Sequence, residues 1–239
     1  RFSPSKVFMI SAFCGATFNL GVIWDGNNLM TLLVFRFLTG FFLAGIYPVG
    51  MKIATDYFDK GLGRSLGFLV GALVVGTAFP HLLSDILNGF PWQIVLISTS
   101  ILATIGGLLI FLFVPDGPFR KAGQQLDLSA IFKVFKNKPF RSAAFGYFGH
   151  MWELYTFWAF VPILLKTYAN IHSIENLSIS SLSFYIIAIG GIACVIGGYL
   201  SEQFGTKQTA FTALFLSAIC SMIVPFSFSI SYFPIFLVF

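Results

Sequence analysis

His150 and Glu153 are the residues whose types and spacing best suit chemistry, because they lie three positions apart inside a long apolar stretch. Residues three or four apart share one face of a helix, and Gly146, Phe157 and Phe160 fall on the same face. A carboxylate in such a setting can accept a proton or pair with a cation, and an imidazole can donate a hydrogen bond to a solute. We therefore expect both side chains to face a cavity. The alternative is a structural His–Glu pair that satisfies itself within one helix.

Two further ionisable residues, Arg36 and His81, lie within other apolar stretches. Arg36 has two possible roles, one in a solute or proton path and one in holding neighbouring helices through backbone carbonyls. His81 follows Pro80, and it either contributes to function or caps the helix near the membrane surface. Aromatic residues close to His150 could bind a planar or cationic solute or simply pack between helices: Tyr147, Trp152, Tyr155 and Trp158.

No enzyme chemistry is expected, because the sequence lacks the residue sets that catalysis or cofactors require. His150-x-x-Glu153 differs from the His-Glu-x-x-His zinc motif, and the cysteines do not have metal-ligand spacing. No phosphate-binding loop for ATP, no nucleophile with a base and no channel filter segment is visible. We predict no metal site and no cofactor.

The composition predicts a protein dissolved in lipid. Hydrophobic residues make up 57% of the 239 residues and charged residues 10%, against about 25% charged in soluble domains. The mean hydropathy is +0.87. About 20 apolar residues cross a bilayer, and the backbone must then be helical. We predict an all-α, polytopic transmembrane bundle with spans at 7–24, 29–51, 64–86, 93–114, 141–165, 178–200 and 208–228, and an eighth beginning near 231.

Basic residues fall almost entirely in alternate loops, which is typical of the positive-inside rule. Lys166 is the one basic residue in the opposite set of loops, and Arg36 lies within a span. The others are Arg1, Lys6, Lys52, Lys60, Arg64, Arg120, Lys121, Lys133, Lys136, Lys138, Arg141 and Lys207. This pattern places the linker 115–140 in the cytoplasm, between domains 1–114 and 141–239, with a surface helix over Leu126–Phe135. The net charge of +5 therefore needs no nucleic-acid partner.

Three segments carry a resemblance to the major facilitator superfamily. Arg36-Phe-Leu-Thr-Gly40, continuing through Gly45 to Pro48, resembles the fourth-helix motif of that family. The glycine-rich stretch from Gly63 to Pro80 is similar to the fifth helix, without the Gly-Pro-x-x-Gly-Gly ending of antiporters. Gly198-Tyr-Leu-Ser-Glu202-Gln-Phe-Gly205-Thr-Lys207 is similar to the second copy of the cytoplasmic loop motif, with Glu in place of Asp.

The resemblance implies a secondary transporter with two six-helix halves, a central cavity and alternating access. The chain would be an internal fragment covering helices three to nine and part of a tenth, or about 7–8 of 12 helices. We expect a monomer in the plasma (inner) membrane that moves a small molecule or ion with protons. The missing antiporter ending favours uptake; a proton/drug antiporter, a channel and a membrane-embedded enzyme are the alternatives. Residues expected to act in gating are Gly40, Gly45, Asp56, Arg64, Gly198, Glu202, Gly205 and Lys207, with Lys52, Asp56 and Arg64 forming one charge cluster.

Overall fold

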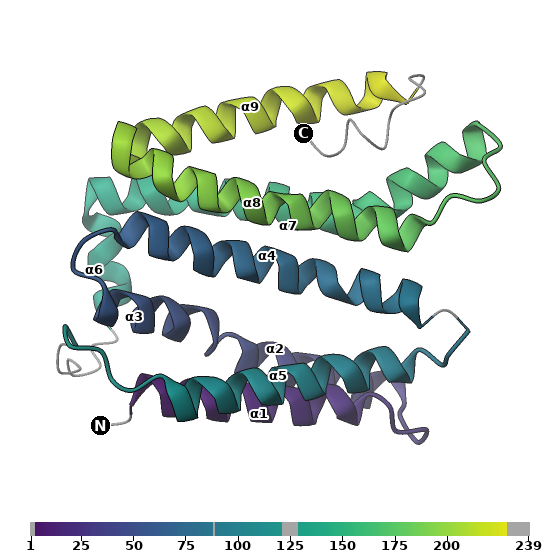
Figure 1. Cartoon of the computed structure of the whole chain (residues 1–239), viewed down its shortest axis with the longest axis horizontal. Helices are drawn as coiled ribbons and strands as arrows, with labels where there is room; N and C mark the ends of the chain where they lie inside the picture. Colours follow the sequence, from purple (N-terminus) through teal and green to yellow (C-terminus); the bar gives the residue numbers. More distant parts are fainter. Residues whose placement is uncertain (1–2, 88, 121–128, 229–239) are drawn as a thin grey trace.

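A computed structural model describes residues 3–87, 89–120 and 129–228 of the chain, and these residues form helices and connections without a strand. The long helices lie side by side and successive ones alternate in direction (Figure 1). The helices are α1 (Pro4–Gly21), α2 (Leu29–Leu43), α3 (Tyr47–Tyr57), α4 (Leu62–Ile86), α5 (Gln93–Phe113), α6 (Ala130–Lys136), α7 (Lys138–Ile171), α8 (Ile179–Phe204) and α9 (Thr206–Ser227). The all-α fold is confirmed, and each of the seven predicted full spans corresponds to a helix or a helix pair.

The predicted span 29–51 corresponds to two helices, because the helix is interrupted between α2 and α3. Pro48 has no N–H, and its ring would clash with the carbonyl four residues earlier, at Ala44. The three residues before α3 form a turn, and a Cβ on Gly45 would lie 2.5 Å from Ser11 Oγ of α1. The break therefore lies where α1 comes close. The predicted span 29–51 is confirmed within the apolar segment Leu29–Tyr57, which α2 and α3 form together.

The outside of the bundle is apolar. Large side chains such as Phe226 and Trp152 are each 80% exposed, and similar residues cover most of the long helices. In the described part of the chain, five helical segments are long and apolar enough to cross a membrane: Leu29–Tyr57, α4, α5, α8 and α9. The helices α1 and α7 have 18 and 34 residues but a more polar composition. Such a surface suits lipid contact and not water.

The most extensive contact between helices joins α4 to α8, and glycines make it close. A Cβ on Gly71 would lie 2.7 Å from the Gly191 carbonyl oxygen, and one on Gly198 would lie 2.7 Å from that of Gly63. Small residues four apart allow backbones to meet in this way. The glycines of α4 and α8 thus form the close contact at these positions. Gly40, Gly76 and Gly197 are exceptions, because a Cβ on any of them would meet nothing within 4 Å.

The two ends of the bundle differ in their connections (Figure 1). The connections near residues 58–61, 114–120 and 205 lie at one end, together with the start of α1. The connections near residues 22–28, 89–92 and 172–178 lie at the other end. Helix α6 overlaps the predicted surface helix Leu126–Phe135, of which residues 126–128 lie outside the described residues. The predicted eighth span near 231 also lies outside them.

Candidate functional site

Glu153 lies in the middle of α7 and is partly buried against α9. Ser217 Oγ donates to Glu153 Oε1 at 2.5 Å, and Ser221 Oγ donates to the same oxygen at 3.2 Å. The two serines lie four apart and therefore share one face of α9. In the described part of the chain no cation lies within ion-pair distance of Glu153. Neutral hydroxyls can donate to a carboxylate and accept from a carboxylic acid, so this site can hold Glu153 in either protonation state.

His150 is partly buried one turn before Glu153, and its Nδ1 atom is buried without a hydrogen-bond partner among the described residues. The alternative of a self-satisfied His–Glu pair is therefore wrong here, since Glu153 turns to α9 instead. An unsatisfied buried nitrogen is costly unless water or a ligand meets it. The helix face that was expected to carry His150, Glu153, Phe157 and Phe160 together is not uniformly buried. Phe157 is partly buried, whereas Phe160 is 51% exposed.

The aromatic residues of α7 separate into a packed one and exposed ones. Trp158 is 9% exposed and packs in a core cluster with Val74, Ala78 and Ile187, which come from α4 and α8. Tyr147, Trp152 and Tyr155 are exposed. Trp158 thus joins α7 to the α4–α8 pair.

A tyrosine that the sequence analysis did not single out, Tyr47 at the start of α3, lies within Coulombic range of Tyr147 and Tyr155. The three phenols come from α3 and α7.

Arg36 of α2 is held by a polar chain across three helices. Its Nη1 donates to Asn19 Oδ1 of α1 at 3.1 Å, and Asn19 Nδ2 donates to Ser100 Oγ of α5 at 3.0 Å. The expected partner was a backbone carbonyl, but the partner is a side-chain amide. Arg36 also lines a cavity of about 440 Å³ between α2, the end of α4 and the start of α5. Asn19 carries no charge and lies in an apolar run of the sequence. Its role as the link between Arg36 and Ser100 is therefore seen only in the structure.

His81 is partly buried in α4, and no described residue forms a hydrogen bond with it. One turn later Asp85 accepts from Ser178 Oγ at 2.7 Å and from Ser181 Oγ at 2.5 Å, at the start of α8. Asp85 was missed by the sequence analysis. Its position near the end of a span, opposite two serines of another span, is the signal that could have found it.

The opposite end of the α4–α8 contact is closed by an ion pair. Arg64 Nε donates to Glu202 Oε2 at 2.7 Å, and the Arg64 backbone N–H donates to Glu202 Oε1 at 3.1 Å. The guanidinium also lies 5.3 Å from the centre of the Tyr199 ring. Gly205 follows with φ +88° at the junction of α8 and α9, a conformation that favours glycine, and Lys207 is exposed. The loop-motif residues thus meet the first turn of α4.

The predicted cluster of Lys52, Asp56 and Arg64 does not form as one unit, because Arg64 pairs with Glu202. Lys52 forms an ion pair with the buried carboxylate of Asp56. The Phe119 N–H donates to the Asp56 carbonyl oxygen at 3.0 Å, and a Cβ on Gly117 would overlap the Asp56 backbone.

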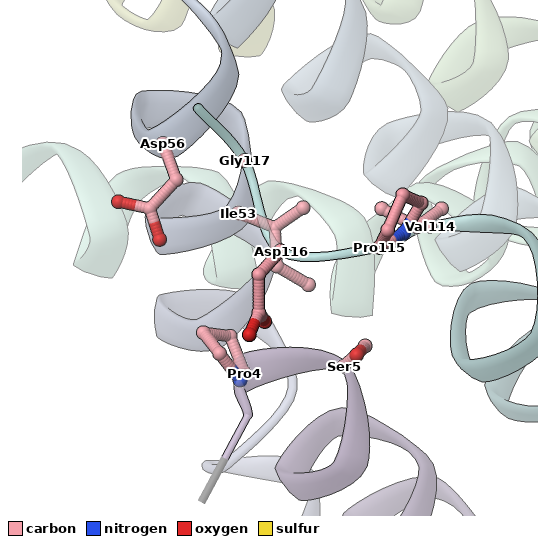
Figure 2. Close-up of a pocket in the computed structure, with 8 residues that line it drawn as sticks. All are labelled: Pro4, Ser5, Ile53, Asp56, Val114, Pro115, Asp116 and Gly117. Atoms are coloured by element: carbon pink, nitrogen blue, oxygen red, sulfur yellow. The ribbon is translucent and has the colours of Figure 1, made fainter. Parts of the chain in front are cut away.

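The end of α3 therefore packs on the first residues of the linker. A cavity of about 10 Å³ remains between them, on the order of one water molecule (Figure 2).

The fold and these polar groups define a polytopic helical protein with partly buried ionisable residues between apolar helices, as in proteins that move solutes across membranes. The sequence model of the Major Facilitator Superfamily matches residues 1–239. The chain belongs to this family of membrane transporters, and it is an integral membrane protein whose family implies a small-molecule substrate. Neither the comparison with curated proteins nor that with solved structures gave a match.

Proposed function

We propose that this chain belongs to a proton-coupled secondary transporter that takes up a small solute by alternating access. The observation that carries the proposal is Glu153, a carboxylate in the middle of α7 that is held by Ser217 and Ser221 of α9. A charge within a membrane helix is costly, by about 2.5–3.5 kcal/mol at the centre on insertion scales, so such residues are usually functional. Because its partners are two neutral hydroxyls, the Glu153 carboxylate can gain and lose a proton without breaking an ion pair.

The unsatisfied Nδ1 of His150 supports a place for solute one turn away from the proton site. A solute that accepts or donates a hydrogen bond there would satisfy the imidazole. Coupling follows if solute binding at His150 is stronger when Glu153 carries its proton. We also propose that Tyr147 and Trp152 border this path; Trp158 serves the path indirectly, by fixing α7 against α4 and α8.

The α4–α8 contact supports alternating access between the domains 1–114 and 141–239. It is closed at one end by Arg64 and Glu202 and at the other end by Asp85 with Ser178 and Ser181. Opening one end while the other stays closed exposes a central path to one side at a time. The basic connections support a cytoplasmic location for the Arg64 end and the linker 115–140, and we propose a monomer in the plasma (inner) membrane.

Proton entry into proteoliposomes tests this function. Pyranine inside the vesicles reports the internal pH while amino acids, sugars and carboxylates are added outside in turn. We expect at least one solute to cause acidification with the parent chain. Glu153→Gln should abolish it, whereas Glu175→Gln, the same change at an exposed residue, should keep it. Equal acidification with Glu153→Gln, or none with any solute in the parent chain, would contradict the proposal.

A further inference from the structure

The Arg36 pocket, lined by Arg36, Ser84, Leu87, Phe90, Trp92 and Leu96 among others, is a second place where charge and cavity coincide. It lies at the end of the bundle that carries the connections 22–28 and 89–92. Its volume of about 440 Å³ falls within the roughly 300–1,000 Å³ of small-molecule sites. Five of its eight lining residues are aliphatic or aromatic, but polar atoms form almost half of the lining surface. Arg36 is its one charged member among the described residues.

No described carboxylate neutralises the positive charge of Arg36. Its hydrogen-bond acceptor is the neutral amide oxygen of Asn19, and no carboxylate of the described chain lies within 4 Å of the guanidinium. Asp85 follows the pocket residue Ser84, but its carboxylate is bound by Ser178 and Ser181 of α8. Arg36 is exposed at the pocket. A guanidinium without a neighbouring carboxylate favours an anion, and its planar donors suit a carboxylate or phosphate.

The geometry of Arg36 also suits binding. The chain from Ser100 through Asn19 fixes one edge of the guanidinium at Nη1. A guanidinium has five N–H donors in a planar fork that matches a carboxylate or phosphate in two-point contact. One edge is thus held by the protein, and the other donors form no hydrogen bond among the described residues.

We propose that the Arg36 pocket binds an organic anion, a carboxylate or phosphate on an apolar body about as large as one aromatic ring. The charged group meets the guanidinium, and the ring lies among Phe90, Trp92 and Leu96. This inference rests on the proposed transport function, because it names the substrate class. It is tested by binding at equilibrium without a proton gradient, so it can fail while the Glu153 result stands.

The probe is 4-nitrobenzoate, whose nitro group quenches the fluorescence of a nearby indole such as Trp92. The full chain is placed in phosphatidylcholine nanodiscs and titrated. We expect saturable quenching that is lost in Trp92→Phe, and no comparable quenching by the uncharged 4-nitrobenzamide. Arg36→Gln should weaken the affinity roughly tenfold or more, since a two-point charged contact is removed. Lys166→Gln, which removes one charge from an exposed site on α7, should leave the affinity unchanged.

Val95→Phe fills the pocket and keeps Arg36, and it should also abolish quenching. This variant tests binding in the pocket if Arg36→Gln does not fold. Phosphatidylglycerol added to the nanodiscs separates the two sources of the anion. If phosphatidylglycerol competes with 4-nitrobenzoate and the competition depends on Arg36, the pocket binds a lipid headgroup. If phosphatidylglycerol does not compete, the pocket binds a free solute. Two results would overturn the proposal: no Trp92-dependent quenching by 4-nitrobenzoate, or equal affinity for it in Arg36→Gln and in the parent chain.

Discussion

The contact between α4 and α8 and the contact between α7 and α9 are built on opposite principles. Backbones meet in the first, where Gly71 and Gly191 approach so closely that a Cβ would not fit. Side chains meet in the second, where two serine hydroxyls reach one carboxylate. Close backbone packing tolerates no added volume, whereas a hydrogen-bonded contact can rearrange when a proton arrives. We infer that the first contact sets the geometry of the two domains and that the second can change with protonation.

The largest effect should come from adding volume to the glycine contact. Gly71→Leu places a side chain where Gly191 O would lie 2.7 Å from Cβ, and we expect a loss of about 2–3 kcal/mol in the free energy of unfolding. Gly76→Leu on the same helix is the matched control, because its Cβ would meet nothing within 4 Å, and we expect a change within about 0.5 kcal/mol. Unfolding by sodium dodecyl sulfate titration measures both. Equal losses in the two variants would mean that the close approach does not matter for stability.

A smaller effect should follow from removing one hydroxyl from the α7–α9 contact. Ser217→Ala deletes the 2.5 Å hydrogen bond to Glu153, and we expect a loss of about 1 kcal/mol. Ser221→Ala deletes the 3.2 Å bond and should cost less. The same titration, performed on both variants and on the double variant, ranks the two bonds. A larger loss for Ser221→Ala than for Ser217→Ala would contradict the geometry.

The smallest effect on stability is expected at the ion pair that closes one end of α4 and α8. Arg64 and Glu202 are partly exposed, so water and salt weaken their attraction. Arg64→Gln should instead lengthen the distance between spin labels at Lys60 and Gln203, measured by pulsed electron resonance. The exchanged pair Arg64→Glu with Glu202→Arg should restore the short distance. Asp85→Asn, at the opposite end, serves as the control and should leave this distance unchanged; a change equal to that of Arg64→Gln would show that the two ends do not open separately.

The long helices could be predicted, because a backbone in hydrocarbon must form its hydrogen bonds internally and a single segment can do so only as a helix. The length of each apolar run shows where such a helix lies. The break before α3 was available in principle from Pro48, but the apolar residues around it hid the turn. The partners of the charged residues were not predictable. Arg64 meets Glu202 across 138 positions, and Glu153 meets Ser217 across 64. Serine and asparagine are also common in apolar helices, so Ser217, Ser221 and Asn19 give no signal until the helices are placed beside one another.

Infrared difference spectroscopy of the chain in lipid, recorded between acidic and basic pH, tests the role of Glu153 most directly. A protonated carboxylic acid has a carbonyl stretching band that a carboxylate lacks. We predict such a band in the parent chain, its loss in Glu153→Gln and a shift of its frequency in Ser217→Ala, because the hydroxyl bonds the same group. A spectrum of Glu153→Gln identical to that of the parent chain would show that Glu153 does not exchange a proton, and the proton-coupled account would be wrong.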